Sequence, residues 1–395
     1  MLEDKDIIYL DNNATTRVAP EVFETMAPWL RDYYGNPSSA YTFGTQVRDA
    51  VETARSQVAA LLGCESREIF FTSCGTESDN AAINSALQIT GHRHVITSGV
   101  EHSAVKNHAE TLERMGYGVT FLPVANDGTL DPSEVEKAIR PDTAIVSLMW
   151  ANNETGVLFP IREIAQICQS TKTLFHTDAV QCPGKIDLTV KDTGINYLSL
   201  SGHKLHAPKG VGVLYIRRRS KFVPYVMGGH QEKGKRGGTE NVASIVGLGR
   251  AAELALNHLQ EEATHTRTLR DHFENQVLDL IPSTKVNGHR AQRLPNTSNI
   301  SFTGASAEAV LLGLNEHKVC ASAGSACTTG SMQASHVLTA MGLKEEEAFG
   351  SVRFSFSHYN TQEEVDQVLS LLPDILHRVQ SGDLKATPAS SAATA

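Results

Sequence analysis

The sequence contains neither a paired-cysteine motif nor a metal-binding histidine motif. Its six cysteines are scattered without a CxxC pair, and its 16 histidines form no HExxH. Zinc knuckles and dithiol redox sites need their ligands or thiols at such spacings, so the sequence indicates neither, and we expect no metal. Free thiols that stay unpaired are typical of a reducing cytoplasm, which is where we expect the protein to act.

Long apolar runs are also missing. The first residues, MLEDKDIIYLDNNATT, are acidic and lack the basic start and apolar core of a secretory signal. No apolar run approaches the ~20 residues of a transmembrane helix. The formal net charge is -9. Nucleic acid and anionic membranes would be repelled at long range, so we expect neither as the main partner.

The composition that is present is that of an ordinary globular protein, with 41% hydrophobic and 20% charged residues in a chain of 395. Such a length is typical of two domains. Predicted strands alternate with predicted helices in the order EIFFTS, HVITSGV, YGVTFLPV, TAIVSLMW and TLFHTDAV. Strict alternation predicts an α/β fold in which helices flank a mostly parallel sheet.

The pattern changes beyond residue 257 to long helices interleaved with short strands. We therefore expect a large domain over residues 17–256 and a smaller α+β domain formed by residues 1–16 and 257–380. The last segment, 381–395, consists mostly of small residues with nothing to bury, and we expect it to be disordered.

Ligands of parallel sheets bind at the carboxyl ends of the strands, so the residues after each strand are candidates for function. The turn TSCGTES contains Gly75 and Thr76 just before a predicted helix. Free backbone N–H groups and the helix dipole suit a phosphate there. An ordinary helix cap without a ligand explains the same residues.

Two further strand ends carry ionisable side chains. Asp178 follows the apolar LFHT, where an unpaired carboxylate would be costly to bury. It is either a capping or ion-paired aspartate, or a partner for a cationic ring nitrogen. His102 ends GVEHSA, and the alternatives there are a helix cap, a satisfied polar group or a catalyst.

Lys204 lies between two apolar runs in YLSLSGHKLHAPKGVGVLY. A lysine that loses hydration in this way tends to give up its proton. A neutral lysine amine is the species that forms Schiff bases. The alternative is a lysine whose head group reaches solvent along the surface.

Cys327 lies in SAGSACTTGS, a run of small residues between a predicted strand and a predicted helix. Inert cysteines are usually buried in a core, so a thiol in such a loop fits a nucleophile better. Taken together, a phosphate cradle, a ring partner, a Schiff-base lysine and a separate thiol are the tasks of a protein in pyridoxal-phosphate chemistry.

The chain resembles the cysteine desulfurases, which are fold-type I pyridoxal-phosphate enzymes of the class-V aminotransferase superfamily. The resemblance runs from about Tyr9 to Gln380 and includes, in the family's order, YLDNNATT, YGNPSS, TSCGTES, VEH, WANNETG, FHTDAVQ, SGHK, RGGTEN and GSAC. The phrases MWANNETG and GSACTTG are similar to the nitrogen-fixation-type subgroup. One departure is SAGSAC, where many members have SSGSAC.

The resemblance implies a role for each residue around the cofactor ring. Lys204 would carry pyridoxal phosphate, His102 would stack on its ring, and Asp178 would pair with the pyridine nitrogen. Gln181 would hydrogen-bond the phenolic oxygen.

The phosphate and the substrate have their own implied partners. Gly75, Thr76, Ser201 and His203 would hold the phosphate, joined by Thr239 from the other subunit of a homodimer. Asn153 and Arg353 would bind the substrate carboxylate, and Asn153 would also contact the cofactor. The alternation of SVRFSFS predicts that Arg353 lies opposite the apolar face of its strand.

The implied reaction converts L-cysteine to L-alanine and leaves a persulfide on Cys327. Lys204 would remove the Cα proton and His102 would handle the proton at the sulfur. The sulfur acceptor stays open between a nitrogenase iron–sulfur scaffold, a general iron–sulfur scaffold and a tRNA-modification relay.

Three alternatives share parts of these motifs. A selenocysteine lyase or a sulfur-mobilisation desulfurase carries a different, shorter segment at the thiol. An aminotransferase has the lysine and aspartate but no task for Cys327. A protein that only binds partners would bind no pyridoxal phosphate.

Overall fold

The larger part of the chain is built around a seven-stranded sheet with the strand order β2-β8-β7-β6-β5-β3-β4. The structure is a computed structural model that describes residues 7–324 and 334–384. The strands are β2 (Ile69–Thr72), β3 (His94–Ser98), β4 (Gly118–Leu122), β5 (Thr143–Met149), β6 (Leu174–Asp178), β7 (Tyr197–Ser201) and β8 (Gly212–Ile216). Only β8 runs antiparallel to its neighbours, β2 and β7. The predicted α/β fold with a mostly parallel sheet is confirmed.

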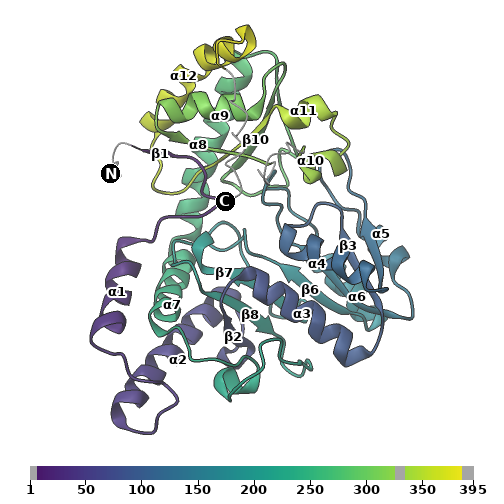
Figure 1. Cartoon of the computed structure of the whole chain (residues 1–395), viewed down its shortest axis with the longest axis vertical. Helices are drawn as coiled ribbons and strands as arrows, with labels where there is room; N and C mark the ends of the chain where they lie inside the picture. The colour runs from purple at the N-terminus through teal and green to yellow at the C-terminus, as the bar shows by residue number, and fades with distance from the viewer. Residues whose placement is uncertain (1–6, 325–333, 385–395) are drawn as a thin grey trace, which may run out of the picture.

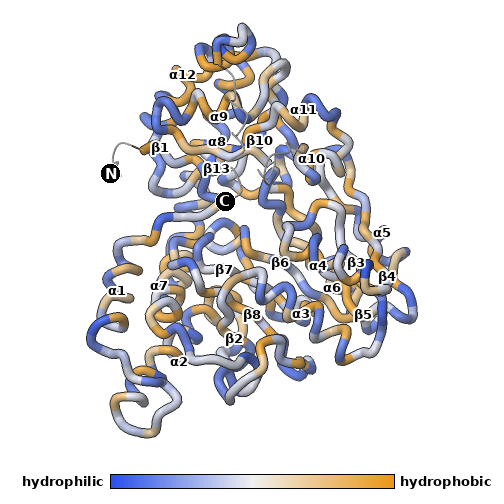
Figure 2. Tube along the Cα trace, in the orientation of Figure 1, coloured by the Kyte–Doolittle hydropathy of each residue, from blue (hydrophilic) through white to orange (hydrophobic). Residues whose placement is uncertain are grey.

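Helices cover both faces of this sheet (Figure 1). Neighbouring strand residues point to opposite faces, so Phe70 packs with α3 and α4 while Phe71 packs in the core on the other face. Hydrophobic and hydrophilic residues alternate along the covering helices (Figure 2). The helices are α1 (Pro20–Arg31), α2 (Thr42–Leu62), α3 (Gly75–Thr90), α4 (Ser103–Arg114), α5 (Pro132–Ala138), α6 (Ile161–Thr171) and α7 (Val242–Asn257).

A second hydrophobic core surrounds a four-stranded antiparallel sheet of order β12-β13-β10-β9. Its strands are β9 (Thr284–Val286), β10 (Thr297–Phe302), β12 (Ser322–Ala323) and β13 (Ser351–Ser355). The helices of this core, at the top of Figure 1, are α8 (Leu259–Leu280), α9 (Ala307–Glu316) and α12 (Gln362–Ser381). Helices α10 (His336–Ala340) and α11 (Glu345–Phe349) place their buried apolar side chains in the core of the larger part. At the centre of the second core the ring of Phe273 contacts Phe354 in a tilted arrangement and Phe356 edge-on.

The N-terminal segment joins the two parts. Strand β1 (Ile8–Tyr9) pairs in parallel with β11 (Val319–Cys320) on one side. A few residues later the backbone N–H of Thr16 donates to the carbonyl oxygen of His203, 2.9 Å away, at the end of the large sheet. The residues between these two anchors therefore cross the boundary between the two cores.

Within the described ranges 7–324 and 334–384, no helix combines the length and apolar character needed to cross a lipid bilayer.

A buried ion pair fixes the segment that leads to Thr239. Arg55 on α2 donates from Nη1 and Nη2 to the carboxylate of Glu232, at 2.7 and 2.8 Å. Glu232 lies in the short helix η4 (Gln231–Gly234), and its carboxylate also accepts from the backbone N–H of Phe71 at 2.9 Å. Both side chains are almost fully buried, at 4% and 3% exposure. The pair thus joins α2, β2 and the loop before Thr239.

Replacing Arg55 by Met should lower the free energy of unfolding by about 3–5 kcal/mol, because a buried carboxylate loses its partner. Urea denaturation of the two proteins measures the difference. The control is Arg31→Met, whose partner Asp32 is exposed and whose loss should cost less than about 1 kcal/mol. Equal costs for the two variants would contradict the assignment.

Candidate active site

A cavity of about 240 Å³ opens at the carboxyl ends of the central strands. Most of the residues predicted for the site line it: Gly75, Thr76, His102, Asn153, Asp178, Gln181, Ser201, His203 and Lys204. They come from the N-terminus of α3, the start of α4, and the ends of β5, β6 and β7. The structure therefore brings together residues that span 130 positions of the sequence in one cavity.

Lys204 ends the short helix η3 (Gly202–Lys204), directly after β7. Its Nζ donates to the backbone carbonyl oxygens of Asn13 and Ala14, the latter at 2.8 Å. Burial, followed by the nearby charges of Arg353 and Lys185, lowers the pKa of Lys204 to about 7. A substantial fraction of this amine is therefore neutral at neutral pH and able to act as a nucleophile or a base.

Asp178 is the last residue of β6 and is buried. Its Oδ1 accepts from the backbone N–H of Val180 at 2.9 Å. Burial raises the pKa of Asp178, and the positive charges of His102 and Lys204 oppose that rise. The carboxyl lines the cavity, so a cationic group of a ligand could serve as its partner.

His102 is the N-cap of α4, and its Nδ1 accepts from the backbone N–H of Ala104 at 3.2 Å. The capping alternative is thus confirmed, and the ring lines the cavity as well. Burial lowers the pKa of His102. In the neutral ring Nδ1 is the acceptor, so Nε2 carries the hydrogen.

Two buried amide oxygens in the cavity wall have no hydrogen-bond partner among the described residues: Oδ1 of Asn153 and Oε1 of Gln181. The other end of the Gln181 amide is satisfied, because Nε2 donates to the carbonyl oxygen of Asn13 at 3.0 Å. Leaving a buried polar atom unpaired costs about 1–3 kcal/mol. Such atoms mark places where a polar ligand group can bind.

The N-terminus of α3 forms another wall. Gly75 is its first residue, and a Cβ there would lie 2.8 Å from Cγ2 of Val180. Ser201 and His203 lie opposite, on the β7 end. Burial lowers the pKa of His203 to about 4, so its ring is neutral at pH 7. Free backbone N–H groups, a hydroxyl and a neutral imidazole suit a phosphate group.

Arg353 approaches from the smaller part of the chain on β13. Its Nη1 donates to the carbonyl oxygen of Asn153 at 3.0 Å, and its Nη2 to Oδ1 of Asp11 at 2.7 Å. Val352 and Phe354 on either side belong to the second core, so the predicted strand faces are confirmed. A planar guanidinium in this place can grip a carboxylate with two parallel bonds.

Two predicted residues fall outside this cluster. Thr239 is exposed and lines a different pocket beside Glu232 and Arg236. Cys327 lies outside the described residues.

Sequence reasoning missed several members of the site. Asn13 and Ala14 contribute carbonyl oxygens, and Asp11 forms the ion pair with Arg353. Asp79 lines the cavity from α3, and its Oδ1 lies 3.5 Å from Nε2 of the buried His176. Burial, followed by the charge of Asp178, raises the pKa of Asp79 well above its usual range. The available signal was spacing: Asp79 follows Gly75 by four residues and so shares its helix face.

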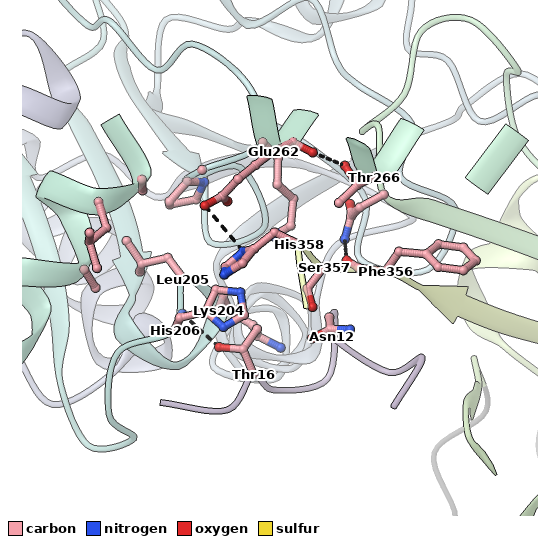
Figure 3. A pocket seen from close by; sticks show the side chains of 17 residues that line it. Asn12, Thr16, Lys204, Leu205, His206, Glu262, Thr266, Phe356, Ser357 and His358 are labelled. Carbon is pink, nitrogen blue, oxygen red and sulfur yellow. Dashed lines mark hydrogen bonds and ion pairs between the residues drawn. The ribbon is translucent and has the colours of Figure 1, made fainter. Parts of the chain in front are cut away.

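Lys204 also borders a second, smaller cavity of about 50 Å³ on its other side. Figure 3 shows its polar lining, with Lys204 and His206 near Thr16, and Glu262 paired with His358. Lys185 belongs to the same lining.

Comparison with known proteins is consistent with this geometry. A model of the family described as "Aminotransferase class-V" matches residues 8–368. A cysteine desulfurase of Trichormus azollae is 54% identical over 95% of this chain and 94% of its own length. The cysteine desulfurase NifS of Azotobacter vinelandii is 50% identical over the same shares. The solved structure of a NifS-like protein from Rickettsia africae has a TM-score of 0.85 at 34% identity, covering 94% of this chain and 99% of that one.

The family implies pyridoxal phosphate, and the cavity fits it. The group carries an aldehyde, a pyridine nitrogen, a phenolic oxygen and a phosphate. The amine of Lys204, the carboxyl of Asp178, the unpaired amide oxygen of Gln181, which could accept from a phenolic O–H, and the α3 N-terminus face the cavity as matching partners.

Replacing Gly75 by Ala should weaken binding of pyridoxal phosphate at least about tenfold, since the new methyl group would press Val180 into the cavity wall. Titration of the apoprotein with the cofactor, followed by its absorbance, measures the loss. The double variant Gly75→Ala/Val180→Ala should recover most of the affinity, because the clash is removed. No loss in the single variant, or no recovery in the double one, would contradict this packing.

Proposed function

Because the chain belongs to the aminotransferase class-V family and is a cysteine desulfurase, we propose that it moves the sulfur of L-cysteine onto Cys327 as a persulfide and releases L-alanine. The observation that carries the proposal is the amine of Lys204, held in one cavity with Asp178, His102 and an α-helix N-terminus. Pyridoxal phosphate, when bound, supplies an electron sink for the bonds around the substrate Cα.

Lys204 serves first as the residue that holds the cofactor and then as the base. Its lowered pKa, about 7, leaves enough neutral amine to accept the Cα proton of the substrate. The carbonyl oxygens of Asn13 and Ala14 orient the amine. Asp178, as an anion, would pair with the pyridine nitrogen of the cofactor and keep it protonated, which would favour the withdrawal of electrons.

His102 handles the proton at the substrate sulfur. Its Nδ1 is occupied by the N–H of Ala104, which leaves Nε2 for the substrate side. Asn153 and Arg353 bind the substrate carboxylate. Asp11 already neutralises part of the Arg353 charge, so the substrate shares or displaces that partner.

The sulfur step balances without an added oxidant. The thiolate of Cys327 attacks the substrate sulfur, and an S–S bond forms as the C–S bond breaks. The electron pair of the broken bond and one proton end on the carbon that becomes the methyl group of alanine.

The protein acts as a homodimer in this proposal, with Thr239 completing the phosphate site of a second copy. Support comes from its position: Thr239 is exposed and lies outside the cavity of its own chain, beside the basic Arg236. Gly75, Thr76, Ser201 and His203 hold the same phosphate from within.

We also propose that residues 17–256 form the cofactor domain and that residues 1–16 with 257–380 form the smaller one. The second core, which draws on residues 8–10 and 269–384, and the change from α7 to α8 near residue 257 support this division. Val337, Leu338 and Met341 instead pack in the core of the larger part. Of the expected tail, 381–395, residues 385–395 lie outside the described residues. Ser381 instead ends α12, and Leu384 is buried in the second core.

The persulfide passes to an iron–sulfur scaffold or another sulfur acceptor protein of the cytoplasm. The resemblance of MWANNETG and GSACTTG to the nitrogen-fixation-type subgroup favours a scaffold for nitrogenase clusters. A pull-down of persulfide acceptors separates this destination from a general scaffold or a tRNA-modification relay.

Borohydride reduction of the loaded protein should fix the cofactor on Lys204. Peptide mass spectrometry should find the added mass on the peptide with Lys204 and leave the one with Lys185 unchanged. Lys204→Ala should abolish both the fixation and the turnover of cysteine. Labelling elsewhere would refute the role of Lys204.

Cys327→Ala should abolish formation of alanine and sulfide from L-cysteine, while the spectral change on adding cysteine persists. The matched control is Cys320→Ala, because burial raises the pKa of the Cys320 thiol and disfavours its thiolate. Cys320→Ala should retain activity. Unchanged turnover of L-cysteine in Cys327→Ala would refute the persulfide step and favour another reaction of the family.

A further inference from the structure

A second lysine lies behind Lys204. Lys185 follows the turn after β6, and the two lysines line the small cavity of about 50 Å³ from different loops. The Nζ of Lys185 donates to the backbone carbonyl oxygen of Gln181 at 3.0 Å. Figure 3 shows the polar groups that share this cavity with Lys204. The roles proposed above give Lys185 no task.

We propose that Lys185 is a positioning residue for the desulfurase reaction. Lys185 fixes the turn at Gln181, and it places a second positive charge near Lys204. That charge favours the neutral form of the Lys204 amine. The inference rests on the proposed role of Lys204 as the base.

The positioning part is a short chain of hydrogen bonds. Lys185 holds the carbonyl group of Gln181, and the side chain of Gln181 donates to the carbonyl oxygen of Asn13. The same Asn13 oxygen accepts from Nζ of Lys204. Lys185 therefore anchors the turn whose side chain shares an acceptor with the catalytic amine.

The charge of Lys185 is not cancelled by an ion pair. Across residues 7–324 and 334–384, no carboxylate oxygen lies within the 4.0 Å of Lys185 Nζ that would define one. The charge of Glu262 acts on Lys185 from across the cavity and raises its pKa, and a carboxylate oxygen of Glu262 lies 3.4 Å from Nδ1 of His358. A buried cation without a close counter-ion raises the cost of a second cation nearby.

The charged and titratable groups around each lysine determine how readily its amine is protonated. Those around Lys204 are Asp11 on the N-terminal segment, Asp178 on β6, His102 at α4, Arg353 on β13, its neighbour His203, and Lys185. Those around Lys185 are Cys182 on its own turn, Glu262 on α8, and His206 and His358 across the cavity. Burial lowers the pKa of Lys185 to about 8, so Lys185 is mostly charged at pH 7. Its charge is among the causes that lower the pKa of Lys204.

The test measures the proton affinity of the Lys204 amine directly in the apoprotein. Trace acylation with acetic anhydride over a pH series, read by mass spectrometry of the Lys204 peptide, gives the midpoint of its titration. Lys185→Met should raise that midpoint by about 0.5–1 pH unit, because a like charge is removed. Lys185→Arg should keep it within error of the wild type.

Further variants separate the two parts of the proposal and guard against misfolding. Lys185→Gln removes the charge but keeps an amide donor for Gln181, so it should shift the midpoint with less loss of cofactor affinity than Lys185→Met. Lys191→Met, an exposed lysine in the same connection between β6 and β7, should change nothing. In the loaded enzyme the acid limb of kcat should move upward with the midpoint, because the Lys204 amine is free to act as a base only in the substrate complex.

The results distinguish this inference from the proposed function. A midpoint that stays unchanged in both Lys185→Met and Lys185→Gln, or that shifts equally in Lys191→Met, overturns the role of Lys185. Because the acylation uses no substrate, a shift found in a protein that forms no persulfide would support Lys185 and reject the proposed function instead.

Discussion

The amine of Lys204 donates to the backbone carbonyl oxygens of Asn13 and Ala14, which lie about 190 positions earlier in the chain. The rest of the structure must bring this N-terminal segment to the lysine. The N-terminal segment must cross from the small sheet to the large one to supply the carbonyl groups. Strand β7 must end where they arrive, and β8 must turn back beside it. The site exists only where the two cores meet.

That placement concentrates ionisable groups in a region with little water. Lys204, Arg353 and Lys185 face Asp11, Asp178 and Asp79, and the low local dielectric makes each protonation state depend on its neighbours. Groups coupled in this way titrate as a set. A change at any one of them is therefore expected to alter the ionisation of the amine as well as its own contacts.

Much of the fold and part of the site followed from local patterns. The alternation of strands and helices predicted the parallel sheet, and the rule that ligands bind at strand ends singled out Asp178, His102 and Lys204. What local patterns could not provide were partners from distant segments. Asp11 and Arg353 meet across 342 positions, and nothing in YLDNNATT taken alone predicts that its carbonyl groups would face a lysine. Lys185 reads as an ordinary loop lysine, and Thr239 has a task only if a second copy is present.

The site is complete only when the segment around Asn13 and the strand β13, which lie 342 positions apart, are both in place. The backbone N–H of Asn13 donates to the hydroxyl of Ser355, and the carbonyl of Asn13 binds Lys204 in between. Contacts of such long sequence separation form late in folding, because the loop that they close must be ordered first. A growing chain in which β13 has not yet been synthesised would already contain Lys204, Asp178 and the phosphate-binding residues. It would lack the strand that ties the N-terminal segment down, so cofactor capture belongs to the finished chain and not to the growing one.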